Sequence, residues 1–189
     1  MKKFTWAAIT AIALLPTASL ADFTGAYAGL AVGSVGGSGE SDFGSGANDF
    51  DLNDSTAFSG FAGYQQQYGT FVYGGELVLS SAPDAQIEGS PDSGVDGAVI
   101  DIKGRAGYAF SEAVMGYATY GFTTLTVDDG VNEQGDADGY IIGAGFDYLA
   151  TPNILLGAEL TRRDVSGDTD NSDFDIEIDS LALRASFKF

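Results

Sequence analysis

The chain has 189 residues, of which 27 are acidic and 8 are basic, and it contains no cysteine and no histidine. A chain with a formal net charge of −19 would be repelled by a phosphate backbone, which argues against nucleic acid as a partner. The missing residue types exclude disulfide bonds, cysteine nucleophiles and histidine-based catalytic triads, so we expect neither an enzyme nor a cofactor.

The first predicted element is an export signal at residues 1–21. Two lysines follow Met1, an apolar run extends from Phe4 to Leu15, and small residues lead to Ala21. This order is typical of a secretory signal peptide, and the apolar run is too short to span a bilayer. The sequence therefore predicts cleavage after Ala21 and a single domain over residues 22–189.

Eight β-strands are predicted after the signal. Short segments of alternating polarity recur between turn-rich stretches, and no helical period is sustained. We expect strands at residues 23–33, 57–67, 70–80, 98–110, 113–126, 139–149, 153–163 and 180–189.

The connections between these strands alternate in length. The links near residues 68–69, 111–112 and 150–152 are tight, and those near residues 34–56, 81–97, 127–138 and 164–179 are long. Outer-membrane barrels combine short periplasmic turns, long external loops and an even number of strands. The sequence predicts an all-β fold, namely an eight-stranded antiparallel transmembrane up-and-down β-barrel.

Alternation within each strand predicts one face toward lipid and one toward the lumen. In the last strand, Leu181, Leu183, Ala185, Phe187 and Phe189 alternate with Ala182, Arg184, Ser186 and Lys188. The third, fourth, sixth and seventh expected strands behave in the same way. In the second expected strand the alternation is weaker, and in the fifth Tyr117 and Thr119 could face either side.

The aromatic residues favour a membrane barrel over a soluble barrel with an apolar interior. Rings gather beside the tight links, at Tyr64, Tyr68, Phe71, Tyr73, Tyr108, Phe110, Phe146, Tyr148, Phe187 and Phe189. Amphipathic rings at one level are typical of a membrane interface.

The charges divide between the long links and the barrel body. The four long links hold 21 of the 27 acidic residues and no lysine or arginine. The body keeps balanced charges, which a narrow polar lumen requires because buried charges must be paired. We expect a lumen charge network formed by Glu76, Asp101, Lys103, Arg105, Asp147, Glu159, Arg184 and Lys188.

Two features leave alternatives open. Glycines on the inner face either leave room for a narrow, water-filled conductance or only permit strong strand curvature. In the last long link, carboxylates at Asp168, Asp170, Asp173 and Asp175 are weak candidates for binding divalent cations. The favoured alternative for these acids is a solvated, repulsive rim.

Several short motifs add a resemblance to a known family. The segments FTGAYAG at residues 23–29, GFAGYQ at 60–65, GRAGYAF at 104–110 and GAGFDY at 143–148 resemble the OmpA-like and opacity-type outer-membrane barrels. The resemblance implies insertion by the barrel-assembly machinery, which recognises a last strand ending in Phe187 and Phe189.

In OmpA itself, interior acids and bases form a salt-bridge gate. By motif position Glu76, Arg105 and Asp147 are similar to members of that gate. Gly157 stands where an arginine of the seventh strand is expected, so either Arg184 substitutes for it or the gate is absent.

The expected protein is a monomer in the outer membrane of a Gram-negative cell, surrounded by lipid and lipopolysaccharide. Its expected role is structural or surface-interacting, with at most a narrow gated pore. The alternatives are a porin for small solutes or ions, tested by conductance, and an adhesin that acts through the acidic external loops. Divalent cations at those loops are a further candidate partner. Fold alone does not choose among these roles.

Overall fold

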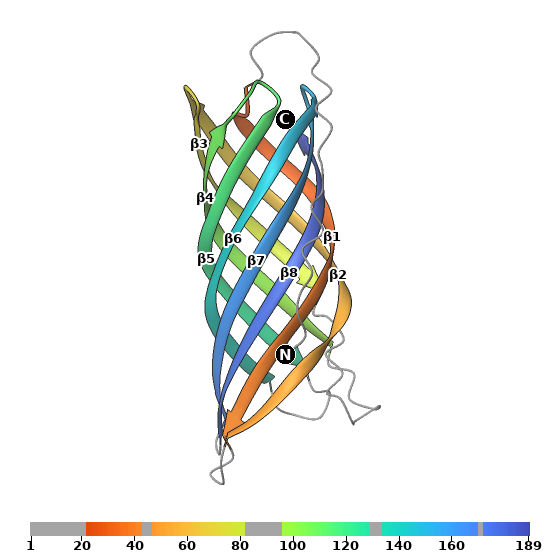
Figure 1. Ribbon diagram of the computed structural model, residues 1–189, viewed down its shortest axis with the longest axis vertical. Helices are drawn as coiled ribbons and strands as arrows, with labels where there is room; N and C mark the ends of the chain where they lie inside the picture. The colour runs from red at the N-terminus through yellow and green to blue at the C-terminus, as the bar shows by residue number, and fades with distance from the viewer. Residues whose placement is uncertain (1–21, 43–46, 82–95, 129–133, 170–171) are drawn as a thin grey trace.

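The strands form one closed barrel. The structure is a computed structural model that describes residues 22–42, 47–81, 96–128, 134–169 and 172–189, so the predicted signal lies outside it. The strands are β1 (Gly25–Asp42), β2 (Ala47–Tyr68), β3 (Phe71–Ser81), β4 (Asp96–Ala109), β5 (Val114–Asp128), β6 (Gln134–Thr151), β7 (Ile154–Thr169) and β8 (Ser172–Lys188). Each pairs antiparallel with the next, and β1 pairs with β8 to close the sheet (Figure 1). The predicted fold class is confirmed.

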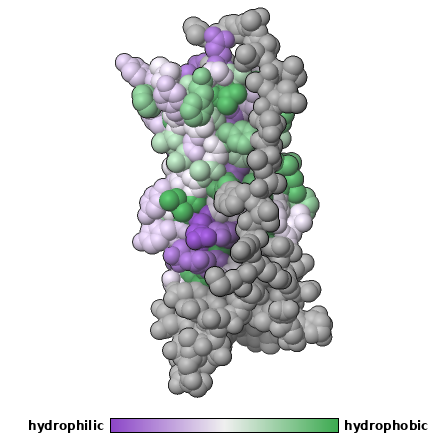
Figure 2. Space-filling model, in the orientation of Figure 1, coloured by the Kyte–Doolittle hydropathy of each residue, from purple (hydrophilic) through white to green (hydrophobic). Residues whose placement is uncertain are grey.

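The apolar face of each strand points outward. In β8, Leu183 is 63% exposed while its neighbour Arg184 is 7% exposed, as the alternation predicts. In β5, the strand that the sequence left undecided, Tyr117 and Thr119 face the lumen, and Tyr120 and Phe122 face outward. Figure 2 shows hydrophobic side chains on the outer wall toward the end of the barrel that carries the tight turns. The described residues contain no helix long and apolar enough to cross a membrane.

The aromatic belt lies at that end, which we call the turn end. Phe71 and Tyr108 meet edge to face with their ring centroids 5.7 Å apart, and Phe187 and Phe189 meet at 5.3 Å. Nine of the ten predicted belt residues have strongly exposed rings, and Tyr148 is intermediate. An exposed belt of this kind fits a membrane–water interface.

The other edge of the apolar band is equally well marked. On β7 and β8 the outward pair Leu160–Leu181 is followed by the charged pair Arg162–Asp179. From Leu181 to Phe189 the outer face is apolar over eight residue steps, or roughly 20 Å for tilted strands. This length is close to the apolar band of an outer-membrane barrel.

A second group of rings, which the sequence analysis did not single out, lies at this far edge. The rings of Phe122 and Tyr140 are 5.5 Å apart, and Thr124 and Asp138 follow them along the outer face. Aromatic girdles on both sides of an apolar band are a feature of outer-membrane barrels.

The predicted long loops are wrong over much of their length. Strand pairing continues through most of residues 34–56, with Asp42 opposite Ala47 and Asp173, and through most of residues 164–179, to Thr169 opposite Ser172. Beyond the apolar band the outward positions become charged, as at Asp164 and Glu177, while an inward position such as Val165 stays buried. The outer face thus loses its apolar residues while backbone pairing continues. We call these parts of β1, β2, β7 and β8 the extension. The hairpins that form it reach the lower end of the barrel in Figure 1.

The β1–β8 pairing predicts which engineered cysteines can form a disulfide. Leu30 and Ala185 are Cα partners on the outer face, whereas Leu181 pairs with Ser34, four residues further along β1. Because the chain has no cysteine of its own, a Leu30→Cys/Ala185→Cys variant should give one intramolecular disulfide, seen as a faster non-reducing gel band. The Leu30→Cys/Leu181→Cys control should not, because about 13 Å of strand separates its Cα atoms. Equal cross-linking of both variants would contradict the closed register.

Candidate functional site in the barrel lumen

The lumen is crossed by paired charges that come from five of the eight strands. Their side chains are at most 7% exposed, and three are acidic and three basic, so the set is neutral. We call these residues the lumen network: Glu76, Lys103, Arg105, Asp147, Glu159 and Arg184. The remaining strands supply Tyr27, Phe61, Tyr117 and Thr119, which contact members of the network.

Glu76 lies at the centre of the lumen network. Its Oε1 is 3.2 Å from Lys103 Nζ, its Oε2 is 3.3 Å from Arg105 Nη1, and Arg184 also pairs with it. The hydroxyl of Tyr27 donates a further hydrogen bond to Oε2 over 2.9 Å. One carboxylate thus contacts three cations, which offsets much of the cost of removing it from water.

Arg105 is held from several sides. Its Nη2 donates to Asp147 Oδ2 over 2.6 Å, and its Nη1 donates to the Tyr27 hydroxyl over 2.8 Å. The guanidinium also stacks over the ring of Tyr117, 3.9 Å from the centroid. A planar cation on an aromatic face is favourable where water is excluded.

Glu159 completes a ring of alternating charges. Lys103 Nζ donates to both of its carboxylate oxygens, over 2.8 and 2.9 Å, and Arg184 pairs with it as well. Glu76 and Glu159 therefore share the same two bases. This arrangement spans the lumen from β3 to β7 and β8.

The glycine of the seventh strand makes room for one carboxylate. A Cβ at Gly157 would collide with the Asp147 carboxylate, and Gly157 is the β8-register partner of Arg184. Arg184 lies on β8, beside Gly157 of β7, and pairs with Glu76 on β3 and with Glu159 on β7. Similarly, a Cβ at Gly145 would lie 2.6 Å from the Tyr117 hydroxyl. At these two positions side chains fill the room beside the inner-face glycine.

Two predicted members of the charge network lie elsewhere. Asp101 is fully buried but pairs with Arg163, whose Nε and Nη2 donate to its carboxylate over 3.1 and 2.7 Å. Lys188 lies at the turn end, where its Nζ donates to the backbone oxygen of Asp22. The sequence analysis did not assign Arg163 to the lumen. Adjacent arginines at 162 and 163 must face opposite sides of a strand, which is the signal that could have placed it.

The remaining site predictions concern the outside of the barrel. Phe187 and Phe189, the predicted assembly signal, face outward in the aromatic belt. The weak cation candidates Asp168, Asp170, Asp173 and Asp175 lie outside the described side chains. Among the side chains that are described, no cluster of three or more acids could hold a metal ion.

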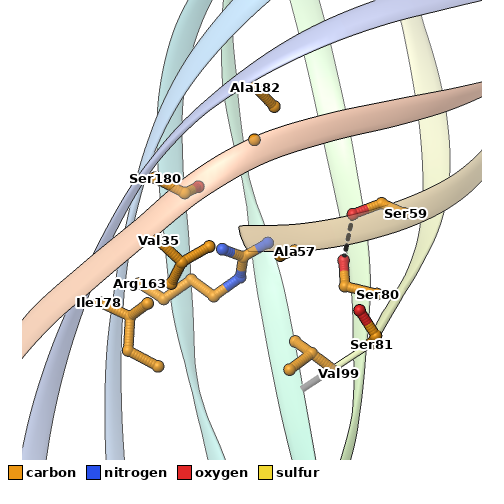
Figure 3. Close-up of a pocket in the computed structure, with 11 residues that line it drawn as sticks. Val35, Ala57, Ser59, Ser80, Ser81, Val99, Arg163, Ile178, Ser180 and Ala182 are labelled. Carbon is orange, nitrogen blue, oxygen red and sulfur yellow. Dashed lines mark hydrogen bonds between the residues drawn. The ribbon is translucent and has the colours of Figure 1, made fainter. Parts of the chain in front are cut away.

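A small cavity lies inside the barrel on the extension side of the lumen network. It has a volume of about 50 Å³, and Figure 3 shows Arg163 among serine, alanine and valine side chains that line it. Ser59 and Ser80 share a 2.8 Å hydrogen bond in its wall. A cavity of this size holds a few waters.

Comparisons with known proteins agree with this geometry. The sequence matches the model of the outer membrane protein beta-barrel domain family over residues 4–189. A 22 kDa outer membrane protein of Rhizobium leguminosarum bv. viciae is 29% identical over 163 residues, which cover 84% of this chain and 72% of that protein. The crystal structure of the outer membrane protein OprG from Pseudomonas aeruginosa is similar with a TM-score of 0.57 and 14% identity, over 88% of this chain and 96% of that one. Ail of Yersinia pestis is similar with a TM-score of 0.49 and 15% identity, over 88% of this chain and 100% of that one.

The lumen network predicts strongly coupled effects on stability. Arg105→Ala leaves Asp147 buried without its cation and should lower the free energy of unfolding by about 3–5 kcal/mol. Arg105→Ala/Asp147→Ala should cost less than the sum of the two single changes, because no unpaired charge remains at that position. Urea unfolding from lipid vesicles measures these values.

The exposed pair Arg162–Asp179 provides a matched control. It makes two contacts of 2.7 Å, where Arg105 and Asp147 make one of 2.6 Å, but its side chains are 54% and 58% exposed. Arg162→Ala should therefore change the stability by less than about 1 kcal/mol. Equal losses for Arg105→Ala and Arg162→Ala would show that burial does not strengthen the network.

Proposed function

Because the chain belongs to the outer membrane protein beta-barrel domain family, we propose that this outer-membrane barrel has a structural or surface-interaction role and no open pore. One observation carries the proposal: the lumen network crosses the interior with six mutually paired charges. A solute moving along the axis would have to break buried ion pairs. At most, the lumen is a narrow path that opens when these pairs rearrange.

The asymmetry of the barrel supports a role at the cell surface. Tight turns close the turn end, which in outer-membrane barrels faces the periplasm. The extension continues the wall at the other end, and its strands carry exposed acids such as Asp164, Glu177 and Asp179. A stable, closed body that supports an acidic external wall suits an anchor for surface contacts.

Export and assembly belong to the same proposal. Residues 1–21 direct the chain across the inner membrane and are removed, and the C-terminal strand with Phe187 and Phe189 is recognised by the assembly machinery. The outward position of both rings supports this assignment. No catalytic step is part of the proposed function.

Single-channel recording tests the closed lumen. Refolded protein in planar bilayers should show no steady conductance, and neither should Arg105→Ala, because Glu76, Lys103, Glu159 and Arg184 still cross the lumen. A compact gel band that is lost on heating verifies folding in each sample. A steady wild-type current that Arg105→Ala alters would replace this proposal with a gated pore for small solutes or ions.

Trimming the extension separates a surface role from a purely structural one. A variant in which a two-residue turn replaces residues 36–53 keeps the pairs of β1 and β2 within the apolar band. In cells lacking the protein, this variant should insert and restore resistance to detergent if the role is structural. If surface contact is the role, it should insert without restoring binding to neighbouring cells.

A further inference from the structure

The chain segment just before β1 enters the barrel instead of continuing along its wall. Strand pairing of β1 begins at Gly25, opposite Gln65. Phe23 lies two residues before Gly25, outside the strands. Its side chain nevertheless has no exposed surface. A residue at the start of a barrel wall can reach such burial only by turning into the lumen.

The ring of Phe23 belongs to an apolar cluster that lies across the mouth of the barrel. The cluster contains Phe23, Val72, Ala109, Met115, Tyr117, Leu149 and Leu155. Apart from Phe23, its members come from β3 to β7, whereas the sheet neighbours of β1 are β2 and β8. Most of them directly precede or follow the tight turns. The cluster therefore fills the mouth of the barrel at the turn end, next to the lumen network.

Side chains of β2 hold the backbone of this segment. Gln65 Nε2 donates to the Phe23 oxygen over 2.8 Å, and the Phe23 nitrogen donates to Gln67 Oε1 over 2.9 Å. The Gln67 nitrogen donates in turn to Thr24 Oγ1 over 3.0 Å. Both backbone polar groups of Phe23 are thus satisfied without strand pairing, as burial requires.

The bend between lumen and wall depends on Gly25. Its φ of 142° is a conformation that residues with a Cβ rarely adopt, and a Cβ there would lie 3.0 Å from the Phe189 oxygen. Lys188 fixes the segment on the other side through the Asp22 oxygen. The same glycine therefore permits both the turn and the close approach of the last strand.

We propose that residues 22–24 form a stopper, with Phe23 as its plug, that closes the periplasmic mouth of the barrel in series with the lumen network. The stopper deepens the proposed function, on which it rests, because a closed lumen then has two barriers of different chemistry. The lumen network resists ions and polar solutes through paired charges. The stopper excludes water through apolar contact and is held by hydrogen bonds to the side chains of Gln65 and Gln67.

A single engineered cysteine reports on the stopper directly. Met115 is 1% exposed and lies in the Phe23 cluster. Because the chain has no cysteine of its own, a cysteine placed at position 115 is the single thiol of the variant. In a folded Met115→Cys barrel, a small charged methanethiosulfonate should react slowly. Adding Phe23→Ala should raise the rate about tenfold or more, since the site then opens to water without local unfolding. Gln65→Leu, which keeps the bulk and removes the hydrogen bond to Phe23, should give a smaller increase.

Controls separate the stopper from general loosening. Phe71→Ala removes an exposed belt ring at the same end and should leave the Met115→Cys rate unchanged. A Ser59→Cys reporter in the cavity beyond the network should react at the same rate whether or not Phe23→Ala is added to it. An unchanged Met115→Cys rate in folded Phe23→Ala protein would overturn the stopper.

Conductance distinguishes this inference from the proposed function. Phe23→Ala alone should stay silent in planar bilayers, because the lumen network still closes the next layer of the interior. A steady current in Phe23→Ala but not in wild type would overturn the two barriers in series while leaving the closed wild-type lumen intact. A steady current in wild type would instead overturn the proposed function.

Discussion

The pairing of β1 with β8 is the interaction on which the rest of the structure depends. A sheet in a bilayer cannot leave an edge of unpaired backbone groups, because hydrocarbon offers them no partner. Closure satisfies both edges but also creates a narrow interior that faces neither lipid nor bulk water. Small barrels must fill that interior with side chains, so each inward-facing residue packs against others inside the barrel.

The chain fills its interior in layers of different chemistry. Apolar side chains and Phe23 occupy the mouth at the turn end, the lumen network comes next, and the Asp101–Arg163 pair borders the small cavity on the extension side. Each charge of the lumen network has an opposite partner, so the desolvation cost of one ion is offset by its contacts. Glu76 shows this most clearly, since a single carboxylate joins bases from β4 and β8 with a tyrosine from β1.

A filled lumen places the distinctive surface of the molecule outside the membrane. The same hydrogen-bonded strands that cross the bilayer continue into the extension, so the acidic segments are carried on a sheet. Register puts acids opposite acids there, as with Asp164 and Glu177. Like charges across a strand pair are unfavourable, and contacts in the barrel body must offset that cost. The paired contacts of the barrel body therefore support the repulsive acids of the extension.

The sequence by itself determined the strand number, the antiparallel closed fold, the tight turns and most outward faces, because alternation is a local property with a period of two residues. The balanced set of barrel charges was likewise readable from composition. Only the tertiary structure decided which charges meet: Tyr27 and Tyr117 joined the network, and Asp101 and Lys188 found other partners. It also turned Phe23 into the lumen and carried the strands past the apolar band. Contacts across the lumen leave no periodic signal along the chain. In the extension the alternation is present, but acids such as Glu177 and Asp179 take the outward positions, so the pattern does not predict a strand that faces lipid.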